Sequence, residues 1–329
     1  MPPRGSSPTM KDVAREAGVS LGTVSKVVNG IPVGKSYQKK VEAAIQKLNY
    51  RMNSYAKGLK SSRTNTIALL MPTTAHPFFG QLTYHINSVL SERGNRMILC
   101  TTEGRQEIEQ AHIRMVQENQ VDGIILLTYT EGLECQEGIP MVTIDRNMSS
   151  SLPCVACDNF AGGQLAAQKL ADNGCRRLAY IGSSSPLPNE PTKRRDGFIS
   201  TCTTLQLPYE LCSVYDDSNY QYFYDFIDSH FHNGVLDFDG LFCCTDMIAS
   251  RVISHLRQLG LRVPEDVQVI GFDGIPDPFT GEYVCSTIVQ PLEQIAIVSV
   301  DLILSEDKAQ IPPLICLPVS YGYGGTTKG

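Results

Sequence analysis

Charged side chains follow several apolar runs of this chain, at the positions where strands would end. Asp145 and Arg146 follow the run at 141–144, and Asp273 follows the run at 267–272. Carboxylate and guanidinium groups so placed make directional hydrogen bonds to a hydroxyl-rich ligand, although an arginine would equally suit a carboxylate or a phosphate. With two phenylalanines for stacking, this set indicates a site for a sugar-like molecule. The candidate effector-binding residues are Phe78, Phe79, Asp145, Arg146, Arg194, Thr245, Asp246 and Asp273.

Motifs for catalysis do not occur in the sequence. It contains no GxSxG, no Walker loop and no HExxH. Cys154 and Cys157 form a lone CxxC, which we interpret as a structural pair of thiols. His230 and His232 are two residues apart, which places them on different faces of a helix. We therefore predict a protein that is not an enzyme and has no cofactor or metal.

Strands and helices alternate from residue 66 onward, which predicts parallel, doubly wound sheets. We expect strands at 67–71, 97–100, 123–127, 141–144, 178–182, 211–215, 240–244, 267–272, 284–290 and 314–317. We expect helices at 77–94, 106–119, 160–173, 193–205, 220–232, 246–259 and 292–304. The pattern restarts after Asp158, so we expect two lobes around a cleft. Ligands bind at the carboxyl ends of such strands, where the candidate residues lie.

The segment 9–29 has the pattern of a helix-turn-helix. Thr9 is a plausible N-cap for a helix at 10–17, and Gly18 ends that helix. Ser20 begins a second helix at 21–28, whose valines lie at helical spacing. Its opposite face is small or polar, as in a helix that enters the major groove of DNA. Two amphipathic helices joined by a glycine turn also occur in proteins that bind no DNA, so this pattern alone leaves both interpretations open.

Charge is distributed unevenly along the chain and favours DNA binding. Residues 1–63 hold 12 Lys and Arg and 3 Asp and Glu. The remainder holds 16 Lys and Arg and 31 Asp and Glu. A basic N-terminal part is attracted to a polyanion such as DNA, whereas the acidic remainder of the chain is repelled by it. A third helix at 37–48 closes a small core. The short basic segment 50–60 is expected to be a linker that orders only when something holds it, and 61–65 completes the joint.

The remaining composition indicates a cytoplasmic protein. Residues 1–8 are rich in Pro and Ser without an apolar core, so we expect a disordered tail and no export signal. No run is long enough to span a bilayer, which predicts no membrane partner. The eleven cysteines are odd in number and scattered, and those in apolar runs, such as Cys100 and Cys243, indicate buried thiols in a reducing compartment.

Together these motifs resemble the lac-repressor family of bacterial transcription regulators, over nearly the whole chain. The resemblance rests on the segment 9–29, on Leu48-Asn49-Tyr50, and in the remainder on His76-Pro77-Phe78-Phe79, Gly271-Phe272-Asp273 and Thr287-Ile288-Val289-Gln290-Pro291. It implies a homodimer that binds double-stranded, pseudo-palindromic operator DNA and is controlled by a small sugar-like effector. The implied DNA-binding residues are Thr9, Ser20, Leu21, Gly22, Thr23, Ser25, Lys26, Asn29, Tyr50, Asn53, Ala56, Lys57, Leu59 and Lys60.

The resemblance also implies a fold. We expect an N-terminal all-α helix-turn-helix domain (9–52), a hinge helix and linker (53–65) and a two-lobed α/β core (66–329) like that of periplasmic binding proteins. The first lobe would comprise 66–158 and 291–314, and the second 159–290 and 315–329. In the family, two hinge helices enter the minor groove, and Leu59 matches the leucine that wedges between bases.

Several positions depart from the family pattern. Leu21 and Gly22 occupy the two positions that typically read bases, and a glycine cannot read a base edge. Met52 stands where a proline is common. The C-terminal signature lacks its arginine, so we expect residues 321–329 to be partly disordered. A free solute-binding protein, or a regulator whose coregulator is a protein or nucleobase, remain the alternatives.

Overall fold

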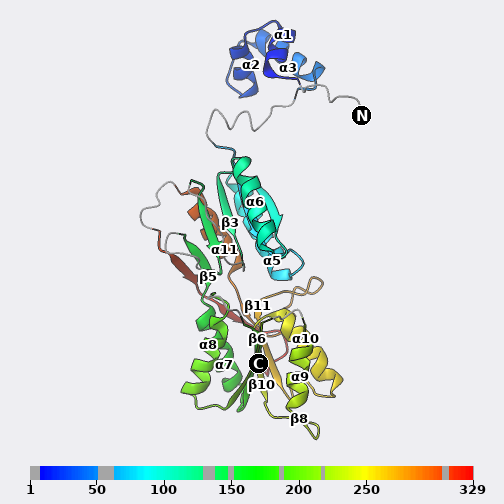
Figure 1. The fold of residues 1–329 in the computed structure, drawn as a ribbon. Coiled ribbons are helices and arrows are strands. Elements are labelled where there is room, and N and C mark those ends of the chain that lie inside the picture. Colours follow the sequence, from blue (N-terminus) through cyan, green and yellow to red (C-terminus); the bar gives the residue numbers. More distant parts are fainter. Residues whose placement is uncertain are drawn as a thin grey trace. The chain divides into compact units, whose positions relative to one another are not determined.

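The computed structural model describes residues 8–50, 63–128, 138–146, 152–184, 189–215, 219–305 and 311–328. The chain forms two compact units, Met1–Thr64 and Asn65–Gly329. Figure 1 shows helices alone in the described part of the first unit, and layers of helices and sheets in the second. The hinge helix and linker were predicted at 53–65. Residues 53–62 of that segment lie outside the described residues.

The first unit consists of α1 (Met10–Ala17), α2 (Leu21–Val28) and α3 (Lys35–Lys47). Thr9 and Asp12 cap α1 reciprocally, and Gly18 ends the helix in the left-handed conformation at φ 63°. Ser20 caps α2 through a 3.1 Å hydrogen bond that its side chain accepts from the amide of Thr23. These two caps hold the turn of the predicted helix-turn-helix.

A small apolar core joins the three helices. It is formed by the buried side chains of Val13, Ala14, Ala17, Val24, Val41 and Ala44. Lys47 also forms a 2.6 Å ion pair with Glu16, which connects α3 to α1 at the surface. Helix α3 begins two residues earlier than expected, with Gly34 at its N-cap.

The second unit contains two six-stranded sheets, one in each lobe. The first lobe's sheet has the strand order β13-β5-β4-β3-β1-β2, and every neighbouring pair is parallel. Its strands are β1 (Thr66–Met71), β2 (Arg96–Thr101), β3 (Gly123–Leu126), β4 (Met141–Ile144), β5 (Cys154–Cys157) and β13 (Leu314–Leu317). The fold class predicted from strand–helix alternation is therefore confirmed.

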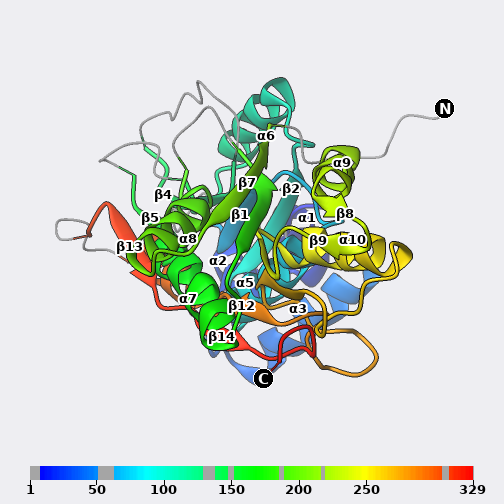
Figure 2. The same cartoon turned by 90° about the horizontal axis from the view of Figure 1, so that it is seen from below.

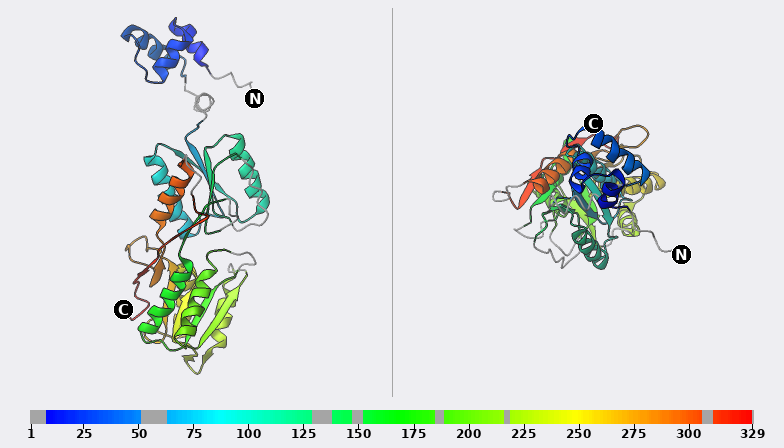
Figure 3. Two further views of the ribbon diagram at one scale, coloured as in Figure 1. Left: turned by 90° about the vertical axis from the view of Figure 1, so that its left-hand side faces the viewer. Right: turned by 90° about the horizontal axis from the view of Figure 1, so that it is seen from above.

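Helices cover both faces of this sheet, because the side chains of a strand alternate in direction. Ile67 and Leu69 of β1 pack with α5 (Pro77–Glu92) and α11 (Leu292–Leu304). Ala68 and Leu70 point the other way, toward α6 (Gln106–Glu118). Figure 3 shows α5 and α11 side by side, with α6 on the other face.

The second lobe repeats this arrangement with the strand order β14-β12-β11-β10-β6-β7. Its strands are β6 (Leu178–Ser183), β7 (Tyr209–Val214), β10 (Gly240–Cys243), β11 (Gln268–Asp273), β12 (Thr287–Val289) and the antiparallel β14 (Ser320–Gly322). Its helices are α7 (Asn159–Asp172), α8 (Lys193–Thr204), α9 (Gln221–Ser229) and α10 (Asp246–Gln258). Figure 2 shows α7 and α8 on one side of this lobe, and α9 and α10 on the other.

The chain passes between the lobes three times: after β5, after β12 and after β13. The third crossing lies at 318–319 and not at 314–315, because β13 pairs with β5 as far as Leu317. Strand β5 itself, which contains the CxxC, was not expected. The helix expected at 220–232 ends at Ser229, and a small hairpin of β8 (Phe231–His232) and β9 (Val235–Leu236) follows it.

The C-terminal segment is ordered, so the expectation of disorder is wrong for residues 321–328. Thr326 and Thr327 are buried. The Thr326 hydroxyl donates to the carbonyl of Val269 at 2.7 Å and accepts from the amide of Ser286 at 2.9 Å. Hydrogen bonds to Val269 of β11 and to Ser286, next to β12, thus hold this segment in place. Among the described residues, no helix combines the length and the apolar character needed to cross a membrane.

Candidate functional site

The exposed face of α2 carries the residues predicted to contact DNA. Leu21, Gly22, Lys26 and Asn29 are exposed. Lys26 forms no ion pair with any described residue. A free ammonium group and small neighbours form a surface that can approach a groove edge closely.

Several predicted DNA contacts already have partners within the unit. The hydroxyls of Thr9 and Ser20 serve as helix caps, and Ser20 Oγ also lies 2.9 Å from the Thr23 hydroxyl. Asn29 donates through Nδ2 to the carbonyl of Ser25 at 2.7 Å, which directs its side chain along the helix end. These side chains therefore stabilise α1 and α2, in addition to any hydrogen bonds that they could offer to DNA.

Tyr50 packs against the apolar core of the first unit, and burial raises the pKa of its phenol. The remaining predicted DNA contacts, Asn53, Ala56, Lys57, Leu59 and Lys60, lie outside the described residues.

The second unit holds a cavity of about 500 Å³ between its two sheets. Strand ends and helix starts from both lobes line it, as expected for parallel sheets. Six of the eight predicted effector-binding residues are among its lining: Phe78, Phe79, Asp145, Arg194, Thr245 and Asp273.

An aromatic wall borders the cavity on the side of the first lobe. Phe78 and Phe79 occupy the first turn of α5, with ring centroids 5.3 Å apart. His76 caps this helix by accepting a 3.3 Å hydrogen bond from the amide of Phe78. Burial, followed by the charge of Arg194, lowers the pKa of His76, so the imidazole is neutral at pH 7. This wall offers apolar faces and no positive charge.

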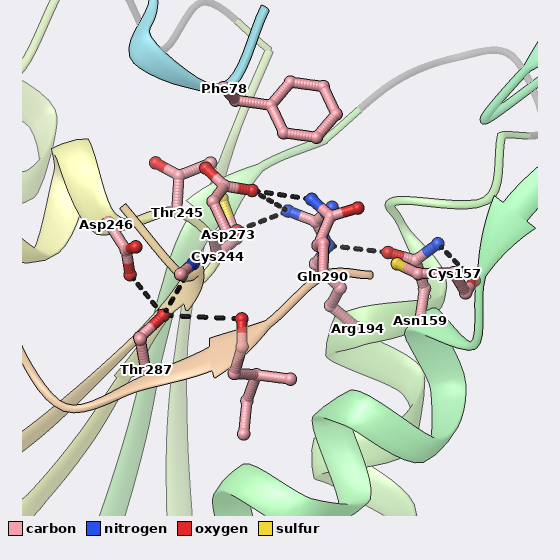
Figure 4. Close-up of polar contacts among 12 residues, drawn as sticks. Phe78, Cys157, Asn159, Arg194, Cys244, Thr245, Asp246, Asp273, Thr287 and Gln290 are labelled. Atoms are coloured by element: carbon pink, nitrogen blue, oxygen red, sulfur yellow. Dashed lines mark hydrogen bonds and ion pairs between the residues drawn. The ribbon is translucent and has the colours of Figure 1, made fainter. Parts of the chain in front are cut away.

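Arg194 is the central side chain of the opposite wall. Its Nε donates to Asn159 Oδ1 at 2.7 Å, and Nη1 donates to the carbonyl of Cys244 at 2.7 Å (Figure 4). Nη1 also lies 3.7 Å from Asp273 Oδ1, and the guanidinium stacks 3.7 Å above the ring of Phe272. Burial lowers the pKa of Arg194, but the surrounding groups, led by Asp273, raise it overall, so the group stays charged.

Two facing glycines let the helices that carry this network approach closely. A methyl group at Gly163 of α7 would overlap the backbone oxygen of Arg194 and lie 2.9 Å from the Phe198 nitrogen. A methyl group at Gly197 of α8 would likewise overlap the carbonyl of Phe160. The backbones of α7 and α8 are therefore in contact, which brings Arg194 within reach of Asn159 at the start of α7.

Asp145 and Asp273 approach the cavity from different lobes. Burial raises the pKa of Asp145 to about 6, and Arg194 opposes that effect. Burial also raises the pKa of Asp273, again against Arg194. Both backbones have positive φ, 60° at Asp145 and 125° at Asp273, which non-glycine residues seldom adopt. Strained, desolvated carboxylates at a cleft are typical of binding sites.

Two of the predicted effector-binding residues do not line the cavity. Asp246 is completely buried at the start of α10, where its carboxylate accepts from the amide of Ile275 at 2.7 Å and the hydroxyl of Thr287 at 2.6 Å. It connects α10 to the loops around β11 and β12 and is not among the lining residues, and the N-cap of α10 is Thr245. Arg146, 9% exposed, also lies outside the lining.

Uncharged lining residues were missed by the sequence analysis. They include Thr73, Tyr180, Ser183, Ser184, Asn189, Thr192, Tyr215 and Gln290. Ser184, Tyr215 and Gln290 directly follow β6, β7 and β12, so the rule that ligands bind at strand ends would have found them.

A helix-turn-helix unit followed by a two-lobed ligand-binding core defines a class of one-chain, ligand-responsive regulators. Residues 9–53 match the bacterial regulatory proteins of the lacI family. Residues 64–307 match the periplasmic binding proteins and sugar binding domain of the LacI family. The chain therefore belongs to the LacI family of DNA-binding transcriptional regulators, and the predicted resemblance is confirmed.

Similar proteins agree with this assignment over most of their length. The sucrose operon repressor of Pediococcus pentosaceus is 33% identical over 307 residues, which cover 90% of this chain and 91% of that protein. The ribose operon repressor of Halalkalibacterium halodurans is 32% identical over 304 residues, which cover 91% of this chain and 90% of that protein. A lac repressor dimer, solved bound to operator and an anti-inducer, matches in fold with a TM-score of 0.80 at 23% identity. The match covers 98% of this chain and 99% of that chain.

Proposed function

We propose that the chain is a transcriptional repressor of a sugar-utilisation operon, which binds a pseudo-palindromic operator as a homodimer in the cytoplasm and has no enzymatic activity. The observation that carries the proposal is that one chain holds both an exposed α2 surface and, between the two lobes of its core, a cavity lined by charged, hydroxyl-bearing and aromatic side chains. The relatives named after sucrose and ribose operons support a sugar as the effector.

The two-lobed core supports regulation by a shift between conformations. The cavity draws residues from both lobes, so a ligand inside it binds best at one particular separation of the lobes. A ligand that prefers one lobe arrangement changes the population of that arrangement. If the arrangement also sets the affinity for DNA, effector and operator are thermodynamically linked, and each changes the other's affinity by the same factor.

The DNA-binding part is tested by selecting duplexes from a randomised library with the full chain. We expect enrichment of sequences with two-fold symmetry, bound with an affinity that falls steeply as salt rises. Enrichment without symmetry would contradict a dimer on a pseudo-palindrome. Lys26→Ala should weaken binding to the selected duplex at least tenfold. Lys169→Ala removes the same charge from the second unit and serves as the matched control.

The effector part is tested by adding sugars to the complex with the selected duplex. We expect sucrose, ribose or a related sugar to change the DNA affinity, as measured by fluorescence anisotropy. Hypoxanthine and adenine form the comparison set, and a response to a nucleobase alone would overturn the sugar assignment.

A further inference from the structure

Helix α2 presents an exposed leucine on the surface that we predict to contact DNA. Leu21, in the first turn of the helix, is 43% exposed. It belongs neither to the buried core of the first unit nor to the partly buried residues around that core. A single exposed leucine is common on protein surfaces and indicates nothing by itself. The residues beside it decide whether it has a function.

Gly22 lies near the middle of the exposed face of α2. Val24 is buried on the opposite face. Residues three or four apart share one side of a helix, so Leu21 and Ser25 flank Gly22 on one side and Lys26 follows it one turn later. An apolar side chain, a position without a side chain and a cation therefore form one continuous surface.

No contact among the described residues requires a glycine at this position. A Cβ atom at Gly22 would meet only Ser20 Oγ, at 3.7 Å, which is an ordinary contact. The residue lies inside the helix, where glycine is less stable than alanine. The missing side chain therefore brings α2 no benefit within the unit. What it does allow is a close approach of another molecule to the helix backbone.

Several polar side chains of α2 are already used within the unit. Ser20 Oγ accepts from the Thr23 amide at 3.1 Å and lies 2.9 Å from the Thr23 hydroxyl. Asn29 Nδ2 donates to the carbonyl of Ser25 at 2.7 Å. Lys26 is exposed and forms no ion pair with a described residue. With Lys26 as the main uncommitted donor, hydrogen bonds from α2 would read few base edges.

We propose, resting on the function proposed above, that Leu21 packs against the C5-methyl group of a pyrimidine in the major groove of the operator, where Gly22 lets α2 approach the bases closely. This methyl group is the apolar feature that a base pair presents in the major groove. Thymine carries it, and so does 5-methylcytosine. Operator binding therefore depends on pyrimidine methylation at one position of each half-site.

The size of the effect follows from the burial of one methyl group. Removing such a group from water changes Kd by about fourfold. A homodimer on a pseudo-palindrome makes the contact twice, at separate places whose effects add as free energies. Loss of both methyl groups should therefore raise Kd roughly fifteenfold.

The test compares duplexes that differ only in methyl groups. In the duplex selected with the full chain, each symmetric pair of thymines is replaced in turn by uracil, which lacks the C5-methyl group and keeps every hydrogen-bonding group. We expect one pair of replacements to raise Kd roughly fifteenfold, as measured by fluorescence anisotropy. At that position, cytosine and 5-methylcytosine, each paired with guanine, form a second comparison.

The two comparisons distinguish the sources of the methyl group. Tighter binding of both methylated bases assigns the contact to the methyl group of either base. Tighter binding of thymine alone assigns it to thymine, and tighter binding of 5-methylcytosine alone assigns it to that base. If every methyl group changes Kd by less than about twofold, the inference is overturned.

A leucine variant tests whether Leu21 makes the contact. Leu21→Ala should bind the thymine duplex more weakly and should no longer distinguish it from the uracil duplex. Leu205→Ala removes a similarly exposed leucine, at 39%, from the second unit and should leave both Kd values unchanged. If uracil weakened binding equally in the wild type and Leu21→Ala, another residue would contact the methyl group, and the assignment to Leu21 would be wrong.

Gly22→Ala tests the close approach of the helix. The added methyl group fits within the unit, so hydrogen exchange of the α2 amides should be as slow as in the wild type or slower. On DNA the same methyl group would lie between α2 and the bases, so the selected duplex should bind at least tenfold more weakly. Wild-type affinity in this variant would contradict the close approach.

The outcomes separate this inference from the proposed function. If no duplex with two-fold symmetry is selected, the proposed function fails and the inference fails with it. If such a duplex is selected and bound tightly, but its affinity is independent of pyrimidine methyl groups, the inference alone fails and a sugar-controlled repressor remains.

Discussion

Gly163→Ala should destabilise the second unit, although alanine favours helices. In an open helix position, the change from glycine to alanine gains about 1 kcal/mol. At Gly163 the added methyl would overlap the backbone oxygen of Arg194, and Phe198 N lies 2.9 Å away. Neither atom can rotate aside, so α7 and α8 must separate by roughly 1.5–2 Å to bring the contact with the Arg194 oxygen to an ordinary distance.

The cost follows from general values for overpacked sites. Overpacking typically costs about 1–3 kcal/mol, and a backbone obstacle places Gly163 at the upper end. After the helix gain, the net loss is about 2 kcal/mol, or roughly 4–8 °C in the unfolding midpoint of a unit of this size. Separation of the helices also stretches the 2.7 Å bond from Arg194 to Asn159, so effector affinity should fall as well.

The assay is thermal unfolding of the full chain, followed by circular dichroism. Gly80→Ala is the matched control, because a methyl group there meets only the Thr74 carbonyl at 3.8 Å, an ordinary contact. Gly80→Ala should keep or raise the midpoint. If Gly163→Ala unfolded at or above the wild-type midpoint, the close backbone contact between α7 and α8 would be refuted.

Three further substitutions have definite expected results. Burial raises the pKa of Asp145 from 3.8 to about 6, so above pH 6 its ionised form lowers the free energy of unfolding by roughly 3 kcal/mol. In urea denaturation, Asp145→Asn should therefore raise the free energy of unfolding by up to that much at pH 7.5, and by progressively less toward pH 4. Thr9→Ala removes the α1 cap, so hydrogen exchange of α1 amides should quicken by a factor that corresponds to about 1 kcal/mol. Thr326→Val leaves the Ser286 amide unpaired and should cost about 1–3 kcal/mol by thermal unfolding, whereas Thr280→Val on an exposed loop should cost less.

Local patterns in the sequence were sufficient to predict most helices and strands. The caps at Thr9, Gly18 and Ser20 define α1 and α2 because each acts within four residues of its own helix. Strand β5 was missed, although its run of four apolar residues is as long as that of β4. Its position depends on pairing with β4 and with β13, about 160 residues further along the chain.

The candidate site shows the same division between local and distant information. Asp145, Asp246 and Asp273 all lie at a strand end or just beyond one, so the sequence could not distinguish them. Structure separates them by direction: the carboxylate of Asp246 turns into the core toward Ile275 and Thr287, whereas Asp145 and Asp273 line the cavity. Directions of this kind depend on tertiary contacts, which a strand-end pattern does not encode.

Helix α11 has a consequence for how the protein folds during its synthesis. Its buried Ile295, Ala296, Val300 and Ile303 cover one face of the first lobe, and Ile303 lies so close to β3 that a methyl at Gly123 would be 2.6 Å from it. The ribosome makes this helix after most of the second lobe. The lobe that begins first along the chain therefore has this apolar face covered only in part, by α5, until α11 emerges. Nascent chains that stop before residue 292 should expose that face, and are the ones we expect chaperones to bind.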